Sequence, residues 1–195
     1  MLPGKSDSKT EGRTSKRKFR RGFKEVLRRE EVIEYWDILI ENGNGESERV
    51  FSDIERNLIK SEAPIKFERK KIAPGIIKGL IGESRDFILV RAKGFRLKPY
   101  QIFINVRDYG RNLQVSWFLT YRYPLLRALM YLIFPFLAPA SKFIERLDLF
   151  NLQDLRAFAS VCHNSTLNAV ENLMIDLDQD TSKINRKTKG FLGIG

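Results

Sequence analysis

The residues best suited to catalysis are one cysteine and one histidine, which are neighbours in the chain at Cys162 and His163. A nucleophilic Cys–His pair needs its two side chains in hydrogen-bond contact. Adjacent residues on a helix point about 100° apart, and Cys162 falls on an apolar stripe, where a buried cysteine is usually inert. We therefore predict structural roles for both residues and expect the protein not to be an enzyme.

A second candidate for chemistry is the acidic run Asp176, Asp178 and Asp180, which is spaced like the start of a calcium-binding loop. Thr181 stands where such a loop needs glycine, and Lys187 stands where it needs a bidentate glutamate. A single cysteine and a single histidine also exclude zinc sites built on several of either residue. We therefore expect no cofactor and no metal.

Two aromatic residues, Phe103 and Phe118, fall on the more polar side of two alternating segments. A sheet face that carries aromatic rings beside basic groups can stack unpaired bases, and Arg107 and Arg122, together with Lys66 and Lys70, are the basic groups we expect to contact phosphate if they share that face. The alternative is that helices cover this face and that both rings belong to a second core.

The net charge of +11 is concentrated at the two ends of the chain. Residues 1–24 hold nine Lys and Arg against two acids, residues 181–195 hold four against none, and the remainder is neutral. We predict that residues 1–22 form a disordered basic arm, which is too polar to offset its ordering entropy. Such an arm can bind anionic lipid or nucleic-acid phosphate, or can simply aid solubility. Its candidate anion-binding residues are Lys16, Arg17, Lys18, Arg20, Arg21 and Lys24.

Residues 125–140 (LLRALMYLIFPFLAPA) form the most apolar segment of the chain. A membrane span takes about 20 apolar residues, whereas Arg127 shortens this run and two prolines interrupt it. The segment can still lie in a membrane interface as a broken helix. The residues expected to contact a membrane or a partner are Tyr131, Phe134, Phe136 and Leu137. The alternatives are a buried core helix and an oligomer interface.

The elements that must position these residues are predicted from hydrophobic periodicity and turn signals. The helical spacing of Val50, Phe51, Ile54 and Leu58 predicts a helix that ends before Ala63-Pro64. Another helix is expected from a cap at Asn151 to about residue 177. Strands are expected at 35–41, 65–72, 86–95, 100–109 and 112–121, the last two forming a hairpin.

This order of elements predicts an α+β fold, a single domain with an antiparallel sheet packed by helices and with basic disordered termini. We expect the domain to span residues 23–180, with the sheet mainly in 65–122 and a helical part in 124–177. Residues 181–195 are expected to be a basic flexible tail. Alternation in the hairpin predicts a core face carrying Ile102, Ile104, Val115, Trp117 and Leu119, among others.

Together these features favour a non-catalytic binding or adaptor protein that docks on an anionic surface. The first choice is the cytoplasmic face of a membrane, because a basic arm and one shallow apolar insertion together give stable anchoring. The N-terminus lacks the apolar stretch of a secretory signal, so we expect a cytoplasmic location, peripheral at the inner face of the membrane. A nucleic-acid-binding protein is the first alternative. A protein-interaction scaffold, with 125–140 as the interface of a homo-oligomer, is the second.

Overall fold

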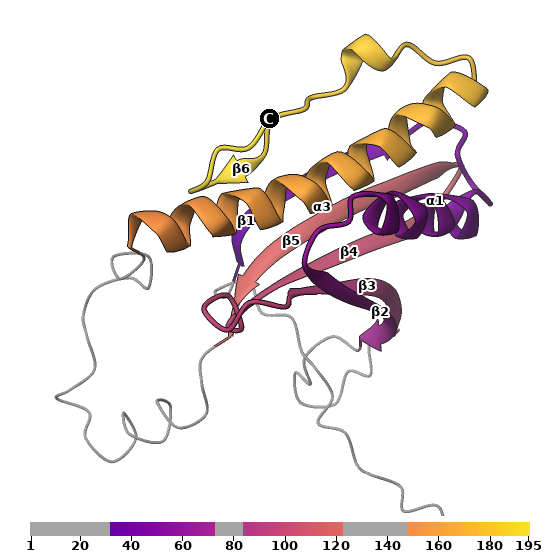
Figure 1. Ribbon diagram of the computed structural model, residues 1–195. Coiled ribbons are helices and arrows are strands. Elements are labelled where there is room, and N and C mark those ends of the chain that lie inside the picture. Colours follow the sequence, from indigo (N-terminus) through magenta and orange to yellow (C-terminus); the bar gives the residue numbers. More distant parts are fainter. Residues whose placement is uncertain (1–31, 73–83, 123–147) are drawn as a thin grey trace, which may run out of the picture.

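The computed structural model describes residues 32–72, 84–122 and 148–195, shown in colour in Figure 1. Within these residues, one antiparallel sheet of six strands packs against two α-helices, which confirms a single α+β domain. The helices are α1 (Ser47–Lys60) and α3 (Leu149–Asp176), followed by the short 3₁₀ helix η4 (Thr181–Lys183). The strands are β1 (Val32–Ile40), β2 (Ile65–Ile72), β3 (Arg85–Ala92), β4 (Tyr100–Tyr109), β5 (Asn112–Tyr121) and β6 (Lys189–Gly190).

The strands lie in the order β2-β3-β4-β5-β1-β6. β2, β4 and β5 have the bounds that the sequence predicts, because clear turn signals and alternating side chains mark both ends of each strand. Gly110, with φ of +63°, makes the tight β4–β5 turn in a conformation that favours glycine. β1 begins three residues earlier than predicted, because Val32 already pairs with β5 opposite Thr120.

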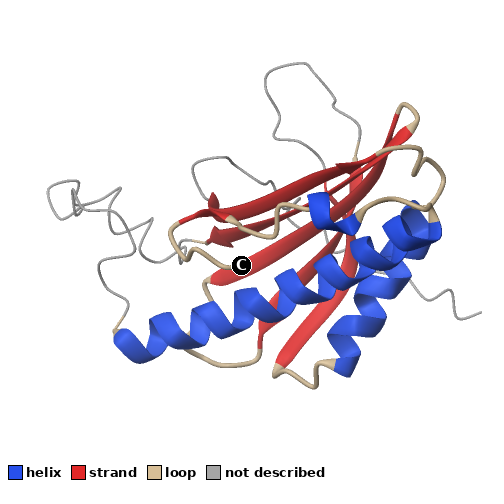
Figure 2. Cartoon of the chain, turned by 90° about the horizontal axis from the view of Figure 1, so that it is seen from above, coloured by secondary structure: helices blue, strands red, loops and turns tan. Residues whose placement is uncertain are grey.

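Helices α1 and α3 lie on the same side of the sheet (Figure 2). The main core fills the space between the helices and this side, which we call the helix face. The predicted core face of the hairpin is confirmed, since Ile102, Ile104, Val115, Trp117 and Leu119 are fully buried there. From the helices, this core takes residues such as Ile54, Leu155 and Leu173.

Each helix has local reasons for its bounds. In α1, Glu48 lies in the first turn and Lys60 in the last. Both charges interact favourably with the helix dipole and stabilise the helix. α3 begins before the predicted cap: Asp148 is the N-cap, and its carboxylate accepts a hydrogen bond of 2.8 Å from the backbone N–H of Asn151. The prediction of Asn151 as the cap was therefore wrong by three residues, since an aspartate upstream fulfils the same role. Residues 124–147 of the predicted helical part lie outside the described residues.

The C-terminal segment 181–195 differs from the flexible tail that the sequence predicts. Its β6 pairs with β1, and Ile184, Leu192 and Ile194 are buried against the main core. Glu34 of β1 is fully buried and accepts hydrogen bonds from the Thr188 hydroxyl and from the backbone N–H of Leu192. The sequence does not predict this packing, because the segment has few apolar residues and they follow neither a helical nor a strand period.

Candidate functional site

The strand directions bring several chain boundaries together at one end of the sheet. Val32 pairs with Thr120, so β1 begins where β5 ends. β2 begins and β3 ends at this same end, because Ile65 pairs with Ala92. The backbone N–H of Arg122 donates a hydrogen bond of 2.7 Å to the carbonyl oxygen before β4, which joins the end of β5 to the β3–β4 loop. We call this end, defined by the β3–β4 loop (residues 93–99), the loop end.

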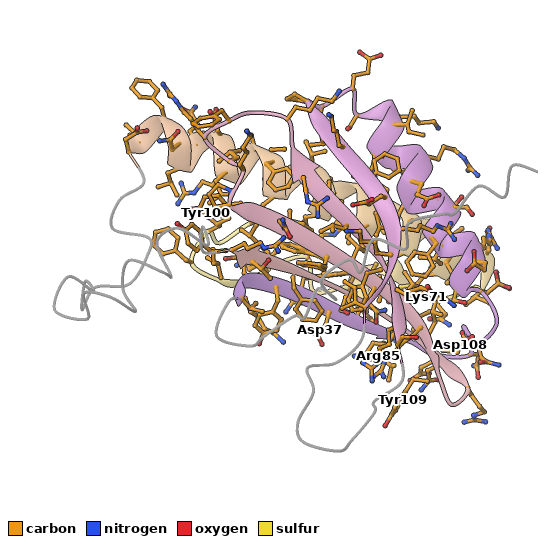
Figure 3. The ribbon with its side chains drawn as sticks, turned by 90° about the horizontal axis from the view of Figure 1, so that it is seen from below. Asp37, Lys71, Arg85, Tyr100, Asp108 and Tyr109 are labelled. Atoms are coloured by element: carbon orange, nitrogen blue, oxygen red, sulfur yellow. The ribbon has the colours of Figure 1, made fainter. Side chains whose placement is uncertain are left out.

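Helix α3 also begins at the loop end. Its residues Asp154 and Phe158 line a cavity together with the β3–β4 loop, whereas Gln179, just beyond its C-terminus, donates a hydrogen bond to the carbonyl oxygen of Glu41 after β1. The helix therefore crosses the sheet from the loop end to the opposite end. Tyr100 and Tyr109, at the two ends of β4, mark these two ends in Figure 3.

The described residues that connect the domain to the two segments singled out in the sequence lie at the loop end. Val32 is the first described residue after the basic arm, and Arg122 and Asp148 border residues 123–147. The candidate residues themselves lie outside the described residues. These are Lys16, Arg17, Lys18, Arg20, Arg21 and Lys24 in the arm, and Tyr131, Phe134, Phe136 and Leu137 in the apolar segment.

The three phenylalanines that are exposed within the described part of the chain all lie at the loop end. Phe95 in the β3–β4 loop is 80% exposed, Phe150 in the first turn of α3 is 70% exposed, and Phe191 beside the start of β1 is 48% exposed. Leu149, next to Phe150, is 76% exposed. Isolated exposed apolar residues are common on protein surfaces, and Leu39, Tyr109 and Ile175 are exposed at the opposite end; the loop end is distinguished by its phenylalanine rings.

Three cations accompany these rings. Lys93, Arg96 and Lys98 lie in the β3–β4 loop, which contains no acid. The ammonium of Lys98 lies 4.7 Å from the centre of the Phe95 ring, a cation–π contact that holds charge and ring side by side. Among the described residues, no ion pair involves any of the three cations. By contrast, Arg69 on β2 is paired with Glu48 and Glu55 of α1.

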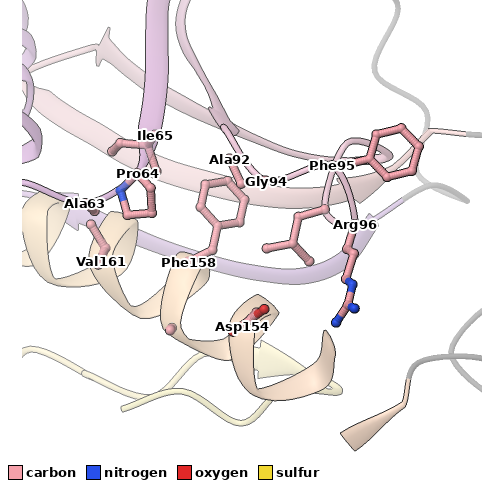
Figure 4. Close-up of a pocket in the computed structure, with 12 residues that line it drawn as sticks. Ala63, Pro64, Ile65, Ala92, Gly94, Phe95, Arg96, Asp154, Phe158 and Val161 are labelled. Carbon is pink, nitrogen blue, oxygen red and sulfur yellow. The ribbon is translucent and has the colours of Figure 1, made fainter. Parts of the chain in front are cut away.

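A cavity of about 530 Å³ opens at the loop end between the first half of α3 and the β3–β4 loop (Figure 4). The start of β2 and the residues before it complete the wall. The lining is apolar except for the side chains of Arg96 and Asp154, and it includes Ala63, Pro64, Ile65, Ala92, Gly94, Phe95, Leu97, Ala157, Phe158 and Val161.

The structure also places the residues proposed for base stacking. Phe103 and Phe118 are paired on neighbouring strands, and they belong to a cluster separate from the main core that α1 and α3 cover. Phe103 is only 5% exposed and packs edge-on against Phe87, with ring centres 6.2 Å apart. This second cluster, formed by Ile72, Phe87, Leu89 and Phe103 with Phe118 against it, leaves little of the Phe103 ring for a ligand.

The two arginines proposed to assist stacking are not brought together. Arg107 donates a hydrogen bond of 2.7 Å to Gln114, and its guanidinium lies 5.3 Å from the centre of the Tyr109 ring. These contacts place Arg107 near the β4–β5 turn, at the opposite end from Arg122, which follows the last residue of β5. No single phosphate therefore reaches both guanidinium groups.

Cys162 and His163 are both in the core, which the apolar stripe predicts for Cys162 alone. The Cys162 thiol is fully buried, and burial raises its pKa well above the ordinary range, so the reactive thiolate is disfavoured. The Nδ1 atom of His163 accepts a hydrogen bond of 3.2 Å from the indole N–H of Trp117. The imidazole also packs edge-on against Trp36, with ring centres 5.5 Å apart. Burial lowers the pKa of His163, which favours the neutral ring.

Sequence reasoning missed the exposed rings of the loop end. It assigned Phe95 to a strand at 86–95, whereas β3 ends at Ala92 and the loop holds the ring outward. The available signal was the order Lys93-Gly94-Phe95-Arg96, in which a glycine and an aromatic residue stand between two cations. Phe150 was missed because the predicted cap at Asn151 placed it before the helix, whereas α3 begins at Leu149.

Comparisons with protein-family models, with curated proteins and with solved structures gave no match to this chain. In the part of the chain that the structure describes, no helix has both the length and the apolar character needed to cross a membrane.

Proposed function

We propose that the protein is a non-catalytic binding protein that docks through its loop end on an anionic membrane surface, with the cytoplasmic face as the first choice. One observation carries this proposal. The end of the domain that presents Phe95, Phe150 and three loop cations is also the end where Val32, Arg122 and Asp148 connect it to the parts of the chain that contain the basic arm and the apolar segment. All four features can therefore meet one surface at the same time.

Stable attachment to a membrane needs two kinds of contact, apolar insertion and attraction to anionic lipid. Each Lys or Arg near an anionic surface contributes about 1 kcal/mol, and this contribution falls off within a Debye length. Full burial of a phenylalanine contributes about 1.5–3 kcal/mol. The three loop cations and the exposed rings at this end would therefore contribute similar amounts to the free energy of membrane binding. Such a balance is typical of peripheral attachment.

The described structure gives less support to the two alternatives. The nucleic-acid alternative relies on the rings of Phe103 and Phe118, but Phe103 is nearly buried and Arg107 already contacts Gln114. The scaffold alternative relies on residues 125–140, which lie outside the described residues. Both alternatives therefore enter the test below as competing outcomes.

The test compares exposed apolar residues at the two ends of the same elements. Phe95→Ser and Phe150→Ser remove rings at the loop end, whereas Tyr109→Ser and Ile175→Ser remove exposed apolar side chains at the opposite ends of β4 and α3. Binding of the full chain is measured by co-sedimentation with phosphatidylcholine vesicles that contain phosphatidylserine.

We expect each loop-end variant to weaken vesicle binding about tenfold, which corresponds to about 1.4 kcal/mol for a ring that is largely withdrawn from water. The two opposite-end variants are expected to bind like the wild-type chain. Equal binding by all four variants contradicts the proposed orientation. Stronger binding to single-stranded RNA or duplex DNA than to vesicles favours the nucleic-acid alternative, and a concentration-dependent oligomer without vesicle binding favours the scaffold.

A further inference from the structure

The cavity at the loop end has the size and the lining of a small-molecule site. Its volume of about 530 Å³ falls within the range of about 300–1,000 Å³ that is usual for ligand pockets, which are mostly apolar with a few polar groups. The wall toward α3 is formed by Ala157, Phe158 and Val161, and the facing wall includes Ala92 and Leu97 (Figure 4). A flexible hydrocarbon chain fits such a lining better than a polar metabolite does.

Small side chains keep this space open. Ala63 and Pro64 between α1 and β2, Ala92 at the end of β3 and Ala157 on α3 all border it. Gly94 also borders it, and a methyl group added there would meet no atom within 4 Å. Phe158 and Leu97, one in each wall, are the buried residues of the lining, with exposed fractions of 5% and 7%. The cavity is therefore continuous with the main core but open toward the loop end.

The charges at the cavity identify the headgroup that fits. Arg96 lines the cavity, and Lys93 and Lys98 flank it in the same loop. Asp154 is the single acid of the lining, and no ion pair joins it to Arg96. The loop thus offers more positive than negative charge, and a guanidinium can form two parallel hydrogen bonds to a carboxylate.

We infer that this cavity binds the acyl chain of a single-chain anionic amphiphile, a fatty acid, with its carboxylate at Arg96. The choice of ligand rests on the proposed function, because docking by the loop end brings the cavity opening to the level where lipid headgroups meet water. The cavity itself is independent of that proposal. Its occupant enters carboxylate outward, with the methylene chain between α3 and the β3–β4 loop.

The test uses the fluorescent fatty acid cis-parinaric acid with the full chain in the absence of vesicles. We expect saturable binding at one site per chain, and displacement by straight-chain fatty acids. Each methylene that enters the cavity should raise affinity about fourfold, until the chain fills it and the gain stops. A steady gain without any plateau would indicate nonspecific partition into an aggregate and would overturn the inference.

A matched pair of tryptophan variants tests the location. Ala157 is exposed on α3 and borders the cavity, so Ala157→Trp should obstruct it without disturbing the core. Asn168 is exposed on nearly the same side of α3, three turns further along and away from the cavity, so Asn168→Trp is the control. We expect the first variant to lose binding of the probe and the second to retain it. Equal binding by both variants overturns the inference.

Charge variants test the headgroup. Arg96→Gln should weaken fatty-acid binding about tenfold, whereas Asp154→Asn should strengthen it, because the removed carboxylate repels the ligand. Dodecylammonium, which carries the opposite charge, should displace the probe poorly from the wild-type chain. If dodecylammonium displaces it as well as dodecanoate does, the assignment of an anionic headgroup is wrong.

The two proposals fail separately in these measurements. Loss of vesicle binding in Phe150→Ser, together with no binding of parinaric acid by the wild-type chain, supports the membrane proposal and overturns the fatty-acid site. Saturable probe binding that Ala157→Trp abolishes, in a chain that does not bind vesicles, supports the site and contradicts membrane docking.

Discussion

Several polar contacts of this domain lie where the C-terminal segment packs against β1. The single histidine of the chain contacts both of its tryptophans there. The indole N–H of Trp36 donates a hydrogen bond of 2.6 Å to the backbone oxygen of Asn185 in the C-terminal segment. Buried polar groups are costly unless they are hydrogen-bonded, so each of these bonds helps to fix one arrangement of helix, sheet and tail.

The burial of His163 predicts a pH-dependent stability. Burial lowers the pKa of His163 in the folded state, whereas in the unfolded chain it stays near about 6.5. Above that value both states hold a neutral ring. As the pH falls below it, the unfolded chain binds a proton that the folded chain does not, so the free energy of unfolding decreases.

Urea unfolding at a series of pH values between about 7 and about 5 measures this slope, because histidine is the side chain that normally titrates in this range. His163→Gln removes the titrating group and should flatten the slope. The ring protons of the one histidine can be followed directly by NMR. An imidazole that titrates near its ordinary pKa in the folded protein would contradict the prediction.

At the scale of elements, the sequence predicted what depends on local pattern. The alternation between Tyr100 and Tyr121 gave both strands of the hairpin and its core face, because a half-buried sheet needs apolar residues at every second position. It did not show which face α1 and α3 cover, since both faces of β4 carry apolar residues and both are buried. Nor did it show that the C-terminal segment packs on the domain, because Glu34, which accepts its hydrogen bonds, lies far away in the chain.

Candidate sites were harder to predict, because they depend on contacts between residues that are far apart in the chain. The cavity forms between residues near 95 and near 157, which no local pattern relates. Phe103 was correctly placed beside Phe118, but its exposure depends on Phe87 of the neighbouring strand. Val32, Arg122 and Asp148, which border the two segments, lie at one end of the sheet because of the strand directions, and no local pattern in the sequence shows this.

The attachment of the C-terminal segment is tested at Gly190. This residue has a φ of +152°, and a methyl group there would overlap both the carboxylate of Glu34 and the backbone oxygen of Ile33. Gly190→Ala should therefore detach β6 from β1 and lower the free energy of unfolding by about 2 kcal/mol or more, since the buried carboxylate loses its donors. Amide hydrogen exchange should speed up at Thr188 and Leu192, and tryptophan fluorescence should shift toward that of an exposed ring.

Gly193→Ala is the matched control in the same segment. Gly193 also has a positive φ, of +59°, but an added methyl group meets no atom within 4 Å. The expected loss is only the backbone cost of about 1 kcal/mol. Equal destabilisation by the two variants would mean that the close approach of Gly190 to β1 contributes nothing beyond its backbone conformation.

For the whole molecule, the distribution of charge predicts how attachment responds to salt. The described domain presents apolar rings and loop cations at one end, where Val32 connects it to the N-terminal part of the chain, and residues 1–24 carry a net charge of +7 out of +11. Tethered contacts to one surface reinforce one another, because the first contact raises the effective concentration of the second. The electrostatic part of binding is screened by salt and the apolar part is not.

Deletion of residues 1–24 should therefore weaken binding to anionic vesicles and flatten its dependence on salt, leaving a net charge of +4, which is +11 less the +7 removed. Phe95→Ser should lower affinity by a similar factor at every salt concentration, because it removes apolar contact without changing charge. Co-sedimentation of both variants at low and high salt, with neutral phosphatidylcholine vesicles as the control, separates the two contributions. If the shortened chain keeps the affinity and the salt dependence of the full chain, the arm takes no part in docking, and the loop cations with the exposed rings must account for all of it.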